Sequence, residues 1–136
     1  MTNINFMINR QSAYRSCHST ETALLRVHHD IATVLDNNSC SILVMLDLSA
    51  AFDVLDHGIL YQRLEYTFGI SGSALAWIKS YLSNRSQQVA IGSALSDSRA
   101  LTIGVPQGSV LGPRLYCIFS KPIGDICESH DMDYHC

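Results

Sequence analysis

Residues Ser41–Asp53 read SILVMLDLSAAFD, and they place a charge where an apolar pattern predicts burial. Five consecutive apolar residues, Ile42–Leu46, are typical of a buried strand, and we expect such a strand from Cys40 to Leu48. Asp47 follows without a break, and Asp53 comes six residues later. Burying an unpaired carboxylate costs several kcal/mol. The strand therefore needs an opposite charge near Asp47.

Length and composition are those of one globular domain, or of part of one. The chain has 136 residues, of which 47% are hydrophobic and 15% charged, and its net charge is -3. This balance argues against disorder, and it does not by itself indicate a nucleic-acid partner. The N-terminal residues are too polar for a signal peptide, and no apolar run approaches the length of a bilayer span. We expect no membrane contact and an intracellular location, in the cytoplasm or the nucleus.

Helices are predicted on both sides of the expected strand. Ser19 is a suitable N-cap, and apolar residues follow it at helical spacing until Asp36–Ser39 end the helix. Asp53 is a suitable cap for a second helix that contains Val54, Leu60 and Leu64 and stops at Gly69. A third helix is expected over about residues 73–82.

In the second half of the chain, the spacing of apolar residues changes from helical to alternating. Residues 88–91 and 100–103 alternate in polarity around the turn SALSDS, which predicts a hairpin. The glycine-proline loop Gly104–Pro113 then leads into a helix over residues 114–119, which Pro122 and Gly124 are expected to break. Helices, a buried strand and a hairpin together predict an α/β or α+β fold.

Asp47 and Asp53 each have two interpretations. A carboxylate at the end of a rigid strand suits Mg²⁺, which takes one or two protein carboxylates and completes its shell with water and substrate phosphates. Alternatively, Asp47 only accepts hydrogen bonds from backbone amides beyond the strand. For Asp53, helix capping is the simpler explanation.

The segment Pro106-Gln107-Gly108 also has two interpretations. It is either an ordinary exit from the hairpin or a rigid loop that presents Gln107 to a flat ligand such as a base or a sugar. Its spacing differs from that of a phosphate-binding loop, because no Lys-Ser/Thr pair follows the glycines. Composition favours the simple exit.

Taken together, three motifs resemble the reverse transcriptase domain of non-LTR (LINE-type) retrotransposons. They are QSAYR-x-CHSTETAL from Gln11, LDLSAAFDVLDHGIL from Leu46 and GVPQGSVLGP from Gly104. The resemblance extends from about Gln11 to the last residue. It implies the fingers and palm of a right-hand polymerase, with a central antiparallel sheet packed on helices and without a thumb. It also implies RNA template, DNA primer and dNTP as partners.

The resemblance also implies roles for particular residues. Asp47 would be the catalytic carboxylate and a Mg²⁺ ligand, joined by the backbone carbonyl of Leu48, so that two divalent cations and a triphosphate compensate its charge. The residues implied to contact the nucleotide are Ala51, Phe52, Pro106, Gln107 and Gly108. Phe52 is the implied gate against a ribonucleotide 2′-OH. Tyr14 and Arg15 resemble a fingers element near the template.

One part of the family pattern is missing from these residues. The family's second metal motif is an Asp-Asp pair, and residues 1–136 contain none. We therefore expect a partial reverse transcriptase domain over residues 1–136, truncated before that motif and inactive by itself. The alternative is a non-catalytic remnant that serves as a nucleic-acid or protein interaction module. Neither interpretation predicts an oligomeric state.

Overall fold

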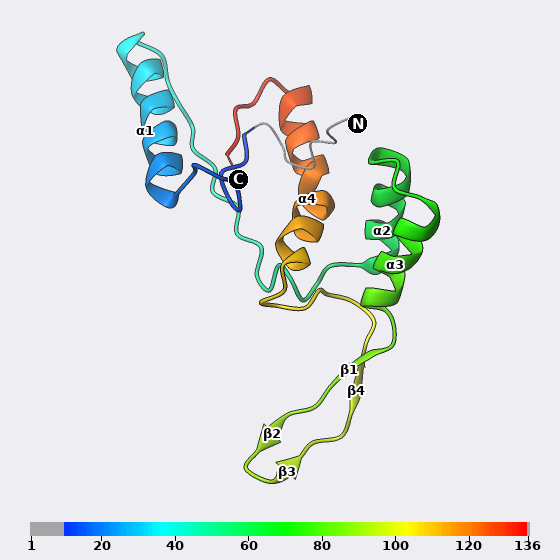
Figure 1. Ribbon diagram of the computed structural model, residues 1–136. Coiled ribbons are helices and arrows are strands. Elements are labelled where there is room, and N and C mark those ends of the chain that lie inside the picture. Colours follow the sequence, from blue (N-terminus) through cyan, green and yellow to red (C-terminus); the bar gives the residue numbers. More distant parts are fainter. Residues whose placement is uncertain (1–9, 136) are drawn as a thin grey trace. The chain divides into compact units, whose positions relative to one another are not determined.

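The computed structural model describes residues 10–135 of the chain (Figure 1). It divides into two compact units, one containing residues 50–120 and the other containing residues 10–49 and 121–135. Five helical segments and four short strands occur in the described part. They are α1 (Thr20–Asp36), α2 (His57–Gln62), the π-helical turn η1 (Arg63–Thr67), α3 (Gly72–Leu82), β1 (Arg85–Gln87), β2 (Ala90–Ile91), β3 (Ala94–Leu95), β4 (Arg99–Leu101) and α4 (Leu111–Ser129).

The core of the 50–120 unit is a cluster of apolar side chains from its helices and from the loop before α4. Leu55, Leu60, Leu64 and Leu82 are completely buried. The other members of the cluster are Phe68, Leu75, Val105, Leu115 and Ile118. Burying a leucine side chain stabilises the fold by roughly 1.5–3 kcal/mol. This core therefore holds α2, α3 and the first half of α4 together with the segment that precedes α2.

The cap of α2 differs from the prediction. Asp56, and not Asp53, is the N-cap, because its side chain accepts a hydrogen bond from the backbone N–H of Ile59 at 2.9 Å. Residues 51–54 form turns before the helix, and Val54 is exposed rather than part of an apolar helical face. Both aspartates satisfy the capping preference, and Leu55, which lies between them, is completely buried.

The end of this helical segment and the start of α3 agree with the prediction. α2 continues into η1, and Gly69 follows with a φ of +66°, the left-handed conformation that commonly ends a helix. α3 begins at Gly72 and ends at Leu82, with Leu75 and Leu82 buried. The apolar spacing of this stretch was therefore sufficient to predict the helix.

The predicted hairpin is present as a narrow two-stranded ribbon. β1 pairs antiparallel with β4, and further along β2 pairs antiparallel with β3. The chain reverses at Gly92–Ser93, which is earlier than the predicted turn. Figure 1 shows the ribbon extending from the end of α3. Because its strands are short and mostly exposed, the expected central sheet packed on helices is absent from the described residues. The fold is a mixture of helices and small antiparallel ladders.

α4 is longer than predicted, because Pro122 lies inside it and does not end it. Proline removes one helical hydrogen bond and its ring crowds the carbonyl four residues earlier, which costs about 3 kcal/mol. An ion pair between Lys121 and Asp125, one turn apart, spans the proline and supports the helix there. No helix among residues 10–135 is long and apolar enough to cross a bilayer.

The second unit contains α1, and its start was predicted correctly. Ser19 is the N-cap and shares a reciprocal pair of hydrogen bonds with Thr22. The hydrogen bond from Ser19 lowers the pKa of Glu21 in the first turn. In the same unit, Arg10 forms an ion pair with Asp133 at 2.7 Å, and Ser12 hydrogen-bonds His135 at 2.9 Å. These two contacts join the segment before α1 to the residues after α4.

The predicted strand from Cys40 to Leu48 is not formed in the structure. Residues 39–48 belong to no helix or strand, and the apolar side chains of Ile42–Leu46 are exposed. An extended segment becomes a strand only when a neighbouring strand accepts its backbone hydrogen bonds. None of the ladders in residues 10–135 includes this segment. The prediction of a buried strand is therefore wrong for the described residues, because the apolar run has no neighbouring strand to pair with.

This exposed run is expected to make the 136-residue chain prone to self-association. Ile42 and Met45 are 89% and 84% exposed. A segment with exposed apolar side chains and unpaired backbone N–H and C=O groups tends to pair with the same segment of other chains. Val44→Glu should therefore raise the monomer fraction in size-exclusion chromatography with light scattering. Ile91→Glu is the matched control, because Ile91 is also exposed but already lies in a ladder. A parent chain that is monodisperse and melts cooperatively would contradict this expectation.

Candidate functional site

Two motifs that lie about fifty residues apart in the sequence meet in the 50–120 unit. The N–H of Val105 donates to the carbonyl of Phe52 at 2.8 Å, and the N–H of Gly104 donates to the carbonyl of Leu55 at 2.7 Å. An isolated antiparallel bridge joins Asp56 to Ile103. The loop before α2 and the loop before α4 are therefore fixed to each other by backbone hydrogen bonds. We call them the paired loops, residues 50–56 and 103–110.

Gly104 allows this close approach. Its φ is +82°, and a Cβ atom on it would lie 2.9 Å from the carbonyl oxygen of Asp53 and 3.0 Å from that of Phe52. Side-chain carbons do not approach backbone oxygens so closely, so only glycine fits here. His57 strengthens the same junction, because its Nε2 lies 2.7 Å from the carbonyl oxygen of Gly104. A carbonyl can only accept, so Nε2 carries the proton in this contact.

Side chains also connect the paired loops. The Nε2 amide of Gln107 donates to the carboxylate of Asp53, at 3.3 Å from Oδ1 and 3.5 Å from Oδ2. Both residues are exposed, so the contact is a long hydrogen bond at the surface. The prediction that Asp53 caps a helix is therefore wrong. Its carboxylate holds the glutamine that the Pro-Gln-Gly motif presents.

The Pro-Gln-Gly segment forms a turn that leads directly into α4. The hydroxyl of Ser109 donates to the carbonyl of Pro106 at 2.7 Å and accepts from the N–H of Gly112, in the first turn of the helix, at 2.9 Å. Gly108 has a φ of +74° with open space around it. The loop is thus held at both ends and exposes its glutamine at the tip.

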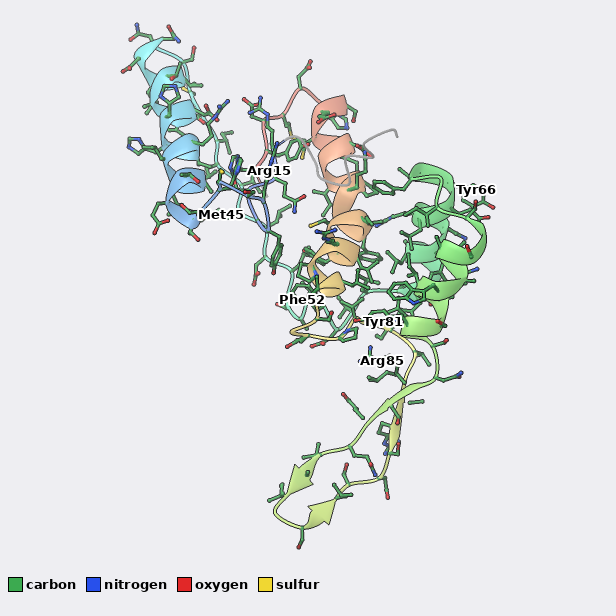
Figure 2. The ribbon with its side chains drawn as sticks, in the orientation of Figure 1. Arg15, Met45, Phe52, Tyr66, Tyr81 and Arg85 are labelled. Carbon is green, nitrogen blue, oxygen red and sulfur yellow. The ribbon has the colours of Figure 1, made fainter. Side chains whose placement is uncertain are left out.

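Phe52 lies at the base of the paired loops. It is half-buried, and its ring centroid lies 5.4 Å from that of Tyr116 on α4. Figure 2 shows Phe52 near the first turns of this helix. Ala51 precedes it and is also half-buried. The structure therefore brings together all five residues that were predicted to contact the nucleotide, within one unit.

The other predicted site residues lie in the second unit. Asp47 and Leu48 are exposed in the extended segment after the apolar run. Tyr14 is exposed with a φ of +59°, and the guanidinium of Arg15 donates to the carbonyl of Gln11 at 3.5 Å. The roles predicted for these four residues stay predictions.

Sequence reasoning missed four contributors to the paired loops. Asp53 and Gln107 are 54 positions apart, so no local pattern indicates their contact. His57 and Tyr116 likewise act through partners that only the folded chain supplies. The Ser109–Gly112 contact alone had a local signal, because a serine before a helix is a typical cap.

Burial shifts the pKa of two side chains beside the core. The guanidinium of Arg63 lies 4.7 Å above the ring of Phe119, and burial lowers the pKa of Arg63. Burial raises the pKa of Tyr61, whose ring lies beneath the ammonium of Lys79 at 5.4 Å. These cation–π contacts hold η1 and α3 to their neighbours, and neither involves the paired loops.

Comparison with known proteins identifies the family. Residues 1–135 match the protein-family model described as "Reverse transcriptase (RNA-dependent DNA polymerase)". The chain belongs to the reverse transcriptase family. The probable RNA-directed DNA polymerase from transposon X-element of Drosophila melanogaster is 37% identical over 110 residues. Those from transposon BS and from mobile element jockey of the same organism are each 32% identical, over 123 and 112 residues. The predicted resemblance to a non-LTR retrotransposon polymerase is confirmed.

The alignments cover most of this reverse transcriptase chain and little of its relatives. They include 81% of the chain for the X-element polymerase, 90% for BS and 82% for jockey. The chain spans only about an eighth of the length of these curated relatives, 12%, 13% and 12% respectively. No solved structure matches the chain significantly.

The donor chemistry of Asp47 suits the Mg²⁺ that the reverse transcriptase family generally uses. An exposed carboxylate is a hard oxygen ligand, and Mg²⁺ binds proteins through one or two such groups while retaining water. Residues 10–135 contain no cluster of three or more acidic, histidine or cysteine side chains that could hold a metal. Asp47 therefore fits one ligand position, and the described residues do not supply a complete site.

Proposed function

We propose that this chain is the fingers and palm portion of an RNA-directed DNA polymerase, and that its paired loops bind the incoming nucleotide. The proposal rests mainly on one observation. Two backbone hydrogen bonds, Gly104–Leu55 and Val105–Phe52, connect the two family motifs. These bonds place Phe52 and Gln107, from distant parts of the sequence, on one rigid support. RNA template, DNA primer and dNTP are the proposed partners, and residues 1–136 are the proposed portion of the domain.

Asp47 is the proposed catalytic carboxylate, with the carbonyl of Leu48 as a second oxygen ligand. Bound Mg²⁺ supplies the positive charge that stabilises the attacking and leaving oxygens of nucleotidyl transfer. The proposed role of Asp47 is to hold that charge through its exposed carboxylate. Tyr14 and Arg15 are proposed to lie near the template.

The proposal is tested in a chimera, in which residues 10–135 replace the corresponding segment of the X-element polymerase. The aligned identity of 37% makes this relative a suitable host. Mg²⁺-dependent extension of a DNA primer on an RNA template is the measured activity. An extension product supports the proposal. A folded chimera that binds template and primer but extends nothing would contradict it.

Phe52 is proposed to exclude ribonucleotides, because its half-buried ring, supported by Tyr116, is bulky and rigid. Phe52→Val removes the ring. In the chimera, this change should raise the ratio of ribonucleotide to deoxyribonucleotide incorporation about ten- to two-hundredfold. Phe52→Tyr keeps the ring and should leave this ratio unchanged. The measurement is the ratio of kcat/KM for the two nucleotide types. Equal ratios in all three proteins would refute the assignment.

Asp53 is a proposed positioning residue that acts through Gln107. Asp53→Ala removes the acceptor of the amide hydrogen bond and should raise KM for dNTP about three- to tenfold, because an exposed hydrogen bond to a charge contributes modestly. Asp53→Asn retains an acceptor and should restore most of the affinity. Steady-state kinetics on the chimera separates KM from kcat. A loss in kcat alone, or no rescue by asparagine, would count against this role.

A further inference from the structure

The peptide group between Gly104 and Val105 is bonded at both of its polar ends. Its N–H, on Val105, donates to the carbonyl of Phe52 at 2.8 Å, and its carbonyl, on Gly104, lies 2.7 Å from Nε2 of His57. A peptide group is planar, so the two bonds together fix the direction in which the whole plane faces. The first bond is made by backbone atoms alone. The second depends on one side chain, His57.

Rotation of this peptide plane is the main freedom at the start of the Pro-Gln-Gly segment. Gly104 has a φ of +82°, and glycine readily adopts the other conformations that such a rotation requires. Val105 is buried and precedes a proline, which restricts its backbone to extended conformations, and the ring of Pro106 fixes its own φ. The chain is therefore flexible at Gly104 and stiff after it. The orientation of the Gly104–Val105 plane decides where Gln107 points.

The helices, and not the loop after Gly104, hold the His57 ring in place. His57 is the first residue of α2, whose N-cap is Asp56. The imidazole is half-buried and lies against the ring of Tyr61, one turn further along, with centroids 6.1 Å apart. Tyr61 packs against the core and lies beneath the ammonium of Lys79 on α3. The donor to Gly104 therefore belongs to the packed part of the unit.

We propose that His57 is a positioning residue for the incoming nucleotide, which acts by locking the Gly104–Val105 peptide plane. This inference rests on the proposed function, in which the paired loops bind the dNTP. The bond from Nε2 keeps Gln107 in the orientation in which the loop meets the nucleotide. Without it the plane rotates, the bond to Phe52 is lost in the same movement, and Gln107 points elsewhere. His57 contacts no reacting atom, so its loss weakens nucleotide binding and leaves the chemical step unchanged.

Three substitutions of His57 separate its hydrogen bond from its bulk. His57→Leu removes the donor and keeps a side chain of similar size. His57→Gln carries an amide N–H at about the reach of Nε2, whereas the amide of His57→Asn is too short to meet the Gly104 carbonyl. The leucine and asparagine variants should raise KM for dNTP about three- to tenfold at nearly constant kcat. The glutamine variant should restore KM to within about twofold of the parent.

The kinetic constants are measured by primer extension in the X-element chimera. His28→Leu is the matched control, because it removes an exposed imidazole from α1 that has no proposed role. An unchanged KM in His57→Leu, or a glutamine variant as weak as the leucine variant, would overturn the proposal. A fall in kcat without a rise in KM would also overturn it. Where His57→Leu does not fold by circular dichroism, the asparagine and glutamine variants decide.

Amide hydrogen exchange tests the locking of the peptide plane without any nucleotide. It is followed by NMR in the 136-residue chain with Val44→Glu. His57→Leu should speed exchange of the Val105 N–H about tenfold. The control is the N–H of Ile70 in the same unit, which donates to the carbonyl of Leu64 at 2.8 Å and should change less than about twofold. No change at Val105, or equal acceleration at Val105 and Ile70, would overturn the proposal.

The two experiments distinguish failure of this inference from failure of the proposed function. A folded parent chimera that binds template and primer but extends nothing contradicts the proposed function, and the nucleotide role of His57 falls with it. A parent chimera that extends primers, with KM unchanged in His57→Leu, contradicts this inference alone. A raised KM that His57→Gln restores, together with faster exchange at Val105, is the result that we expect.

Discussion

Gly104→Ala is expected to lower the free energy of unfolding by about 3 kcal/mol or more. A non-glycine residue at a φ of +82° costs about 1–3 kcal/mol. The added Cβ would also lie within 3.0 Å of two backbone oxygens, those of Asp53 and Phe52. Backbone cannot move aside as a side chain can. Either the paired loops separate, with loss of the two backbone bonds that join them, or the strain persists in the folded chain.

Gly108→Ala is the matched control for this change. Gly108 has a similar φ of +74°, but a Cβ there meets no atom within 4 Å. Only the conformational cost remains, and it should be about 1 kcal/mol. Both variants are compared by urea unfolding in the Val44→Glu background, which is expected to limit self-association. Equal losses of stability would mean that the close approach of the loops at Gly104 does not hold.

Features that short-range forces determine could be predicted from the sequence. The Ser19 cap of α1, the left-handed stop at Gly69 and the helical face of α3 follow from the preferences of residues within one or two turns. The resemblance also pointed to Phe52 and Gln107, whose loops the structure joins by backbone hydrogen bonds; their contact with a nucleotide stays a prediction.

Features that depend on distant partners could not be predicted. The apolar run before Asp47 predicted a buried strand, but a strand requires a neighbouring strand, and no local pattern supplies one. Asp53 and Asp56 had the same capping chemistry, and no local pattern indicated that Asp56 is the cap. Pro122 was expected to end α4 because proline disfavours the interior of a helix. Its neighbours Lys121 and Asp125 form an ion pair across it instead.

Asp47→Ala is expected to have the largest effect on catalysis. Removing one electrostatic partner from a preorganised site reduces kcat by about a hundred- to a thousandfold. Loss of a catalytic carboxylate that binds a divalent cation should reduce kcat at least as much. Asp36→Ala is the matched control, because Asp36 is an exposed carboxylate at the end of α1 and has no proposed role. Circular dichroism and template binding show that both variants remain folded.

The central claim is that these residues supply the first metal-binding carboxylate of a reverse transcriptase, and primer extension by the chimera tests it most directly. Extension on an RNA template should require Mg²⁺, fall at least a hundredfold in Asp47→Ala and remain unchanged in Asp36→Ala. The polypeptide of residues 1–136 alone, which contains no Asp-Asp pair, should extend no primer. An Asp47→Ala chimera as active as its parent, or extension by the 136-residue polypeptide itself, would contradict the account.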